Sequence, residues 1–330
     1  MSLALKEKLK EAFEKFPYET HQLFLRNYIP ITINPFSLNE SNILENYTSK
    51  YVNDEIKLEE NMFDKNAFLN LYFSQSAKRF KLNNDSKFER KYESGRGLLS
   101  KIIDIEKDLT LYDFFSLSSA DLASEIAVFN VKKGVKFNHI KKVEGIGNLL
   151  YNAYYYLEDN SSVNVYSLTS GKMYVRERIY SFNRGSMSSF NAKIGYDLED
   201  ASTTDSTIIN KLMAPKSSAT SYQKSIVRKY SKTIHKGLVV NTASGVEGNS
   251  YIEQKALLLS KDASVQNIPG MELEINDIFA KHSAAVFPVD EDQMFYLMSR
   301  GLSRNDSITL LAKNLLRDIR EALGFENELY

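Results

Sequence analysis

Few side chains in this sequence have the type and spacing that catalysis or metal binding requires. Cysteine is absent, which excludes disulfides, thiolate nucleophiles and cysteine ligation of zinc or iron by this chain. The four histidines are scattered, and no two have the separation of a helical or hairpin ligand pair: His21, His139, His235 and His282. We therefore expect a chain that is not an enzyme by itself, although one histidine could still serve a site that a partner completes.

Three short patterns resemble catalytic motifs, and each lacks part of what its motif needs. Gly145-Ile146-Gly147 has no third glycine, so it is not a dinucleotide loop. Ser221-Tyr222-Gln223-Lys224 matches S-x-x-K without the companion motifs of that family of enzymes. Glu272 and Glu274 would share one face of a strand and could act together on a glycan. A solvated strand face explains these two glutamates more simply.

The composition is that of an ordinary globular protein without overall charge. The 330 residues are 43% hydrophobic and 25% charged, and 42 Lys and Arg balance 42 Asp and Glu. A balanced chain has no long-range field to attract nucleic acid or an anionic membrane. Residues 1–16 form a charged amphipathic pattern rather than a secretion signal, and no stretch approaches the ~18 apolar residues of a membrane span. We expect a cytoplasmic protein that binds neither nucleic acid nor membrane.

The N-terminal part of the chain carries no interpretable motif. A helix is predicted at its start, with an apolar face made by Leu3, Leu5, Leu9, Phe13 and Phe16. Residues 18–100 are irregular and rich in Asn, Tyr and Lys, and helical pieces are plausible near Asn66 to Phe80. We expect residues 1–110 to form a helical and irregular region.

From about Leu111 the chain changes to short β-type runs separated by polar turns. The runs are rich in Val, Ile, Tyr, Thr and Ser and alternate partly with period two: Val163–Leu168, Met173–Tyr180, Phe190–Tyr196, Ile234–Val240 and Tyr251–Ser260. Turns are predicted at Thr169–Gly171, Asn183–Gly185 and Thr242–Asn249. A β-sandwich and a β-solenoid both fit, and the solenoid fits slightly better, although no fixed-period repeat is visible.

The clearest local prediction is a pair of helices near the C-terminal end. Asp290 can cap a helix that runs to about Ser299, and Gly301 then sits where a left-handed residue would end it. Ser303 to Asp306 resembles a capping box, with Asp in place of the usual Glu or Gln. The second helix is expected to end at Gly324, and its apolar stripe consists of Ile308, Leu311, Leu315, Ile319 and Leu323.

One stretch of the sequence matches the ordered pattern of a known family. The pattern has an LLLS-type strand, a proline, a Glu with an acidic pair, His-Gly-Ala-Thr, an acidic turn and F-Y-L-x-S-R-G-I/L-S. The matching residues are Leu257–Ser260, Pro269, Glu272, Asp277, His282, Asp290-Glu291 and Phe295–Ser303. In order, spacing and chemistry this stretch resembles the SufB/SufD family of iron–sulfur cluster assembly proteins, and the SufD branch more closely.

The differences from this pattern indicate which branch of the family the chain resembles. His282-Ser283-Ala284-Ala285 stands in place of His-Gly-Ala-Thr, and Asn276 replaces the first member of the acidic pair. In the SufB branch a cluster-associated cysteine follows the glutamine that aligns with Gln254, whereas this chain has Lys255. The chain therefore resembles the SufD partner or a divergent relative, and it could not replace SufB as a thiolate scaffold.

The resemblance implies a mainly β fold: a right-handed parallel β-helix over residues 111–286, with helical regions at 1–110 and 287–330. It also implies that strands of two subunits pair side by side, the other subunit being a SufB-type paralogue or a second copy. His282 would be a candidate metal ligand contributed at that interface. No cofactor would be tightly bound to the isolated chain, and an iron–sulfur cluster would be present only transiently in the complex.

The resemblance further implies that the C-terminal helices dock SufC, an ABC-type ATPase. ATP-driven closure of that ATPase would move the two β-helix subunits, and this chain itself would hydrolyse nothing. The candidate contacts are Phe295, Tyr296 and Arg300 on the first helix and Ile308, Leu311, Leu315 and Ile319 on the second.

Two other functions stay open. A carbohydrate-active β-helix enzyme would need clustered carboxylates, and Glu272 with Glu274 is its only hint. A purely structural interaction protein could have kept the fold and lost the cluster role, which the changes at Ser283 and Ala285 allow. Copurification with an ATPase and a cysteine-bearing paralogue would favour the assembly subunit, and activity on polysaccharides would favour the enzyme.

Overall fold

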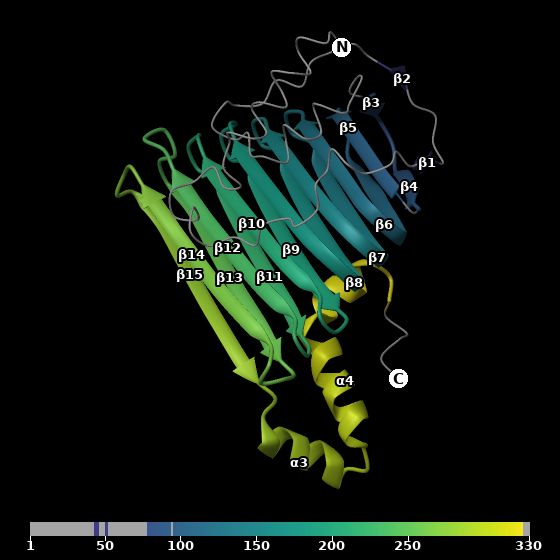
Figure 1. Cartoon of the computed structure of the whole chain (residues 1–330). Helices are drawn as coiled ribbons and strands as arrows, with labels where there is room; N and C mark the ends of the chain where they lie inside the picture. Colours follow the sequence, from purple (N-terminus) through teal and green to yellow (C-terminus); the bar gives the residue numbers. More distant parts are fainter. Residues whose placement is uncertain (1–42, 46–49, 52–77, 94, 326–330) are drawn as a thin grey trace, which may run out of the picture.

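The structure is a computed structural model that describes residues 43–45, 50–51, 78–93 and 95–325. The described strands lie side by side in one long stack, and the helices follow the last strand and run back along the stack, so that α5 packs against β8 and β9 (Figure 1). The strands are β1 Ile43–Glu45, β2 Lys50–Tyr51, β3 Lys78–Leu82, β4 Ser86–Tyr92, β5 Gly95–Ile105, β6 Leu109–Val131, β7 Lys136–Leu157, β8 Ser162–Asn183, β9 Ser189–Leu198, β10 Thr203–Leu212, β11 Ser218–Val227, β12 Lys232–Asn241, β13 Gly248–Leu258, β14 Ser264–Leu273 and β15 Ile278–Pro288. The helices are α3 Glu291–Ser299, α4 Arg304–Leu315 and α5 Arg317–Ala322.

Successive coils of the chain pair in parallel and build two sheets that face each other. Sheet A contains β4, the first halves of β6, β7 and β8, and then β9, β11, β13 and β15. Sheet B contains β3, β5, the second halves of β6, β7 and β8, and then β10, β12 and β14. This arrangement is a parallel β-solenoid, as predicted, and it excludes the sandwich, whose strands would be antiparallel.

The coils differ in length, and this hides the repeat in the sequence. Lys136 pairs with Ser162, 26 residues further along the chain. Ser218 pairs with Asn249, 31 residues further along. The added residues lie in the turns, so the stacking of the strands is kept while the sequence period drifts.

The core lies between the two sheets and follows from the alternation along each strand. In β9, for example, Phe190, Ala192 and Ile194 point inward and are buried, while the residues between them are half-buried. Aromatic rings from neighbouring coils stack inside, such as Phe129 on Tyr155 with centroids 4.7 Å apart. Burial of this inward row is the main force that holds the coils together.

The strands begin earlier than the expected boundary at residue 111. β3, β4 and β5 already pair in parallel with later coils, and the expected boundary falls inside β6. The predicted helix over residues 1–16 lies outside the described residues, and so does most of the stretch from Asn66. The described end of that stretch, Lys78 to Phe80, belongs to strand β3 and not to a helix. The alternation in β4 was hard to recognise because one of its inward positions is the charged Arg90.

The predicted turn at Thr169–Gly171 is wrong, because β8 runs through it from one sheet to the other. The chain bends at this corner on glycines with positive φ, at Gly171 and at Gly145 in the preceding coil. A Cβ added to Gly145 would lie 1.9 Å from the carbonyl oxygen of Leu117. The Gly145-Ile146-Gly147 pattern is therefore a corner of the solenoid. The turns predicted at Asn183–Gly185 and within Thr242–Asn249 are confirmed.

We expect Gly145→Ala to lower the free energy of unfolding by at least about 3 kcal/mol, because the methyl group would meet a neighbouring backbone and φ is +121°. Gly134→Ala is the matched control. Its φ is +74°, but a Cβ there has nothing within 4 Å, so a cost of about 1 kcal/mol is expected. Urea unfolding of the two variants measures both values, and equal costs would contradict the corner interpretation.

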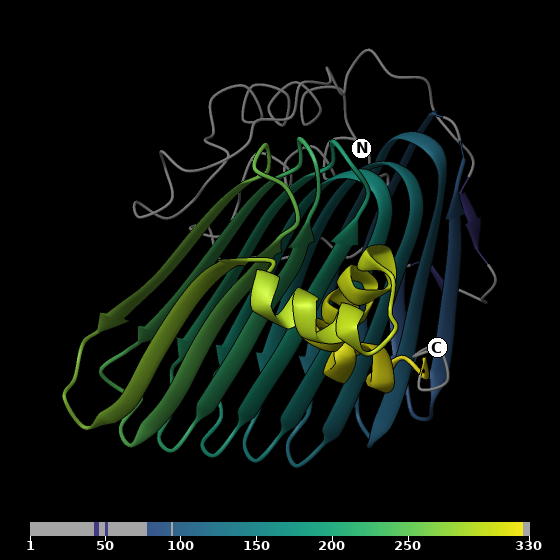
Figure 2. The ribbon, with the colours of Figure 1, turned by 90° about the horizontal axis from the view of Figure 1, so that it is seen from below.

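The C-terminal helices begin and end as predicted, but the second is interrupted. Asp290 caps α3 by accepting the Asp292 N–H, and Ser303 caps α4 by accepting the Asp306 N–H. The chain leaves helical geometry at Leu316, so α4 and α5 are separate elements and not the single helix expected. This break lets Leu316 and Ile319 both reach the outer face of sheet A, where they are buried against Leu168. The helices lie against one side of the stacked strands (Figure 2).

Candidate functional site at the open end of the solenoid

Among the described strands, none continues the stack beyond the last coil, which we call the open end of the solenoid (Figure 1). Within the described residues, β15 pairs only with β13, and β14 pairs only with β12. Each of these strands therefore presents a row of backbone N–H and C=O groups that another strand could pair with.

His282 lies on this open coil. Its position in β15 continues the row of side chains that point into the interior in the preceding coils. Its Cα partner in β13 is Ile252, which is buried inside the stack. No further described coil lies over β15, so the imidazole of His282 is exposed. The neighbours on the same row are Ala280 and Ala284, whose small side chains leave the ring accessible.

The described residues around His282 do not form a set of metal ligands. Among the described residues, no group of three or more His, Asp or Glu side chains could hold a metal ion. Ser283, which replaces the glycine of the family pattern, forms a hydrogen bond within the chain, since its hydroxyl lies 3.0 Å from the Tyr251 hydroxyl.

Polar side chains fill the interior next to the open coil. Asn267 of β14 donates to the Ala285 carbonyl at 3.2 Å, so it joins the two last strands across the interior. Its Oδ1 lies 3.1 Å from Nδ1 of His235, and Nε2 of His235 lies 2.7 Å from the Ser225 hydroxyl. An amide oxygen only accepts, so Nδ1 of His235 carries the proton and Nε2 accepts from Ser225.

Burial lowers the pKa of His235 to about 4, so this ring is neutral in the folded protein near pH 7. The unfolded chain takes up this proton below about pH 6.5, whereas the folded protein does not until about pH 4. Stability therefore falls with falling pH through this window, by about 2 kcal/mol between pH 7 and pH 5 from this residue alone.

The test compares how the free energy of unfolding changes with pH in the unmodified chain and in the variant His235→Gln. In His235→Gln this contribution should vanish, while that of His139, whose pKa burial also lowers, remains. Urea unfolding at several pH values measures both slopes, and equal slopes would contradict the prediction.

The opposite end of the interior holds a network of buried charges that the sequence did not reveal. Asp113 pairs with Arg90, with Lys101 at 3.2 Å and with His139 at 3.2 Å, and all of these side chains are fully buried. Glu125 completes the network by pairing with the same Arg90 at 2.7 Å. Burial alone would raise the pKa of Asp113, but Arg90 and Lys101 outweigh it and hold that pKa well below its ordinary value. The network is sealed from solvent, so it holds coils together and offers no access to a substrate.

Helix α3 carries an exposed aromatic patch. Phe295 is 76% exposed, Tyr296 is 57% exposed, and Met298 and Leu302 extend the apolar surface. The guanidinium of Arg300 lies 5.3 Å from the Tyr296 ring, so it borders the same patch. We call Phe295, Tyr296, Met298, Arg300 and Leu302 the α3 patch. Exposed apolar side chains that gather in this way are typical of a binding surface.

The other predicted ATPase contacts, on the second helix, differ in how deeply their side chains are buried. Ile308, Leu311 and Leu315 are half-buried. Ile319 is completely buried against sheet A and cannot touch a partner in this arrangement. The helices are held to sheet A by Asp318, which pairs with Lys224 at 2.8 Å and Lys193 at 3.2 Å. Most of the apolar stripe predicted on the second helix therefore packs inside the chain.

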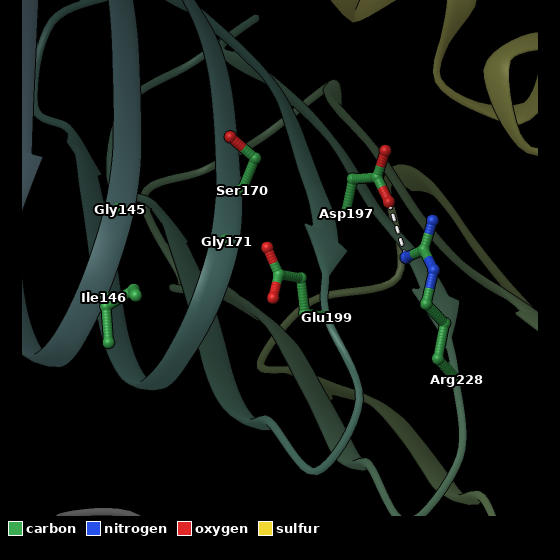
Figure 3. A pocket seen from close by; sticks show the side chains of 7 residues that line it. All are labelled: Gly145, Ile146, Ser170, Gly171, Asp197, Glu199 and Arg228. Carbon is green, nitrogen blue, oxygen red and sulfur yellow. Dashed lines mark ion pairs between the residues drawn. The ribbon is translucent and has the colours of Figure 1, made fainter.

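The motif-like residues are not assembled into a catalytic site. Ser221 points inward and its hydroxyl accepts from Asn210, whereas Lys224 points outward to Asp318. Glu274 follows the end of β14, and its carboxylate accepts the Ala243 N–H at 2.8 Å. A hollow of about 450 Å³ lies at the corner near Gly145 and Gly171 (Figure 3). Its charged lining includes Asp197 and Arg228, which pair with each other at 2.6 Å.

Comparison with known proteins decides the family. A family model described as "SUF system FeS cluster assembly, SufBD core domain" matches residues 102–314. The chain belongs to the SufBD family. The matched residues run from β5 into α4, so they include His282 and the α3 patch.

Curated relatives support the same family over a shorter part of the chain. The chain is similar to proteins named "Iron-sulfur cluster assembly SufBD family protein" from Staphylococcus haemolyticus, Staphylococcus epidermidis and Staphylococcus aureus. Each is 32% identical over 113 residues, which is 34% of this chain and 24% of the relative. The match thus spans about a quarter of the length of these SufBD relatives. Among the described residues, the helices are too short or too polar to cross a membrane.

Proposed function

We propose that this SufBD family chain is a SufD-like subunit of an iron–sulfur cluster assembly complex and catalyses no reaction itself. The observation that carries the proposal is the position of His282 on the last coil of the solenoid, beyond which no further described strand pairs. The proposal has three parts: pairing with a second solenoid, contribution of one ligand to the cluster, and docking of an ATPase.

The second solenoid pairs with the open coil. The free edges of β14 and β15 can each add a strand, which would continue both sheets across the interface. The partner is a SufB-type paralogue or a second copy of this chain. A paralogue with cysteine would supply the thiolate that this chain lacks, since Lys255 occupies that position here and pairs with Glu253 at 2.9 Å.

The iron–sulfur cluster is cargo of the complex. A neutral imidazole binds iron, and His282 is exposed at the edge where the partner's ligands would arrive. One ligand holds a metal weakly, so the cluster assembles only when both subunits are present. The isolated chain should bind iron poorly.

A SufC-type ATPase docks on the α3 patch. Only Val289 and Asp290 separate β15 from α3, so a displacement of α3 acts directly on the strand that carries His282. Arg304 of α4 also pairs with Glu291 of α3 at 2.8 Å, and α4 and α5 connect to sheet A. ATP-driven motion can therefore reach the last coil without unfolding the core.

The test of the cluster role is His282→Ala in the reconstituted complex. The variant should assemble normally but yield at least about tenfold less transferable cluster, because a ligand is lost while the fold is not. Lys281→Ala is the matched control, since the neighbouring residue of β15 is exposed on the opposite face. Full cluster delivery by His282→Ala would remove the ligand role and favour a purely structural SufBD protein.

A further inference from the structure

The two strands at the open end of the solenoid differ in the backbone groups along their outer edges. In a parallel ladder each residue bonds the two neighbours of its Cα partner, while the partner itself points the other way. The N–H of Ser264, at the start of β14, donates to the Ser231 carbonyl at 3.0 Å, and the N–H of Glu274, just after β14, donates to the Asn241 carbonyl at 3.0 Å. β14 pairs with β12 without a register shift, so its even-numbered residues face β12 and its odd-numbered residues face away.

Pro269 lies on the outer edge of β14. The residues of β14 that face away from β12 are Val265, Asn267, Pro269, Met271 and Leu273. Proline has no N–H, so the row of donors along this edge is interrupted at its centre. A strand added to sheet B could therefore pair with only two residues on either side of Pro269. Proline at such a position is a common means of protecting an exposed sheet edge from pairing.

The outer edge of β15 has no such interruption. The N–H of Asn249 donates to the Ser217 carbonyl at 3.0 Å, so the odd-numbered residues of β13 face β11 and its even-numbered residues face β15. The Cα partners of those even-numbered residues are the even-numbered residues of β15, which therefore face away from β13. They provide a continuous row of N–H and C=O groups: Ala280, His282, Ala284 and Val286.

This row lacks the features that protect edge strands. It contains no proline, lysine or bulge, since β15 pairs with β13 without a register shift. The side chains of the row continue the inward positions of β13, and Val286 is 42% exposed. A strand added here would satisfy the backbone groups of all four residues and would also bury apolar surface.

Pairing along this row would also fix where a partner's ligand lies. His282 belongs to the row, so a strand paired with it would run about 4.8 Å away. Side chains that lie opposite each other on neighbouring strands point to the same face of the sheet. Residues of the added strand would therefore project beside the imidazole of His282, whereas a strand added to β14 would lie in the opposite sheet.

We propose that the second solenoid is recognised through sheet A: a strand of the SufB-type paralogue adds to β15 along residues 280–286, and Pro269 prevents an equally continuous pairing along β14. This inference rests on the proposed function, in which the open coil pairs with a second solenoid. The occupant is the paralogue and not a second copy, because a second copy would bring no cysteine to the position beside His282.

Hydrogen exchange compares the two edges without altering the chain. In the purified complex with the SufB-type paralogue, the edge amides in the peptide of residues 278–288 should exchange at least about tenfold more slowly than in the free chain. The peptide of residues 264–273 should change by less than about threefold, because its edge amides have no continuous partner. Equal protection of the two peptides, or stronger protection of residues 264–273, would overturn the proposal.

A pair of proline variants compares the same edges by mutation. Ala284→Pro and Met271→Pro each replace a residue whose N–H points away from the neighbouring strand, so both variants should fold. Ala284→Pro removes a donor from the row and leaves an acceptor of the partner unpaired, so the affinity for the paralogue should fall at least about tenfold. Met271→Pro should change it by less than about threefold.

Titration calorimetry with the purified paralogue measures both affinities, and thermal unfolding checks the fold of each variant. Equal losses, or a larger loss in Met271→Pro, would refute recognition through sheet A and leave the proposed function intact. If the unmodified chain did not bind the paralogue at all, the proposed function would be refuted together with this inference. Pairing of β15 only with a second copy of the chain would contradict the assigned occupant.

Discussion

Replacing both Phe295 and Tyr296 with alanine is expected to weaken binding of a SufC-type ATPase strongly while the solenoid stays folded. Both side chains are more than half exposed on α3, so their removal takes nothing from the core. Large aromatic anchors at the centre of an interface typically contribute about 2 kcal/mol or more each. The double variant should therefore weaken binding by roughly a thousandfold.

Titration calorimetry with the purified ATPase measures this loss, and thermal unfolding checks the fold. Gln293→Ala is the matched control, because Gln293 is exposed on α3 and lies outside the α3 patch. An affinity within a few-fold of the unmodified chain would place the ATPase elsewhere. Deleting residues 303–330 would be a poorer test, since it would uncover Leu168, Ile226 and Leu257.

Asp113→Ala is expected to lower the free energy of unfolding by about 3–5 kcal/mol. The carboxylate is fully buried between Arg90, Lys101 and His139, so its removal leaves cationic groups without half of their compensating charge. Glu125 stays in place but already pairs with Arg90. A buried pair that loses one member is penalised far more than an exposed one because water cannot replace the missing charge.

Glu158→Ala is the control for this variant. Glu158 pairs with Lys132 at 2.7 Å, both side chains are 48% exposed, and the loss should stay below about 1 kcal/mol. Urea unfolding at pH 7 gives both values. Because the pKa of Asp113 is lowered in the folded state, its stabilisation is present above the ordinary value of 3.8 and is lost as pH falls through and below it. Similar losses in the two variants would show that the network contributes little.

The local features near the C-terminal end could be predicted because each depends on a few neighbouring residues. Asp290 and Ser303 cap their helices, and Gly301 takes the left-handed conformation, as their side-chain chemistry requires. Alternation also predicted strand runs such as Phe190–Tyr196 and Ile234–Val240, which lie in β9 and β12, but it did not predict β3 to β5. The family pattern around His282 then favoured a solenoid over a sandwich, and the parallel pairing of successive coils confirms it.

The buried charges could not be predicted, because Arg90, Lys101 and Asp113 come from three separate strands, β4, β5 and β6. A charged residue normally indicates a solvated face. Only the stacking of the coils brings these side chains together and supplies opposite charges that make their burial tolerable.

Composition, the absence of cysteine, the caps and the strand alternation are properties of the sequence alone, since each follows from residue type and short spacing. The tertiary structure decided which of these residues meet. It placed Ile319 against sheet A and left Phe295 exposed, although both belong to apolar patterns of helices. It also placed His282 on the last coil, where the interior row meets solvent because no further described strand continues the stack. Exposure depends on what lies across the fold, and residues far apart in the sequence determine it.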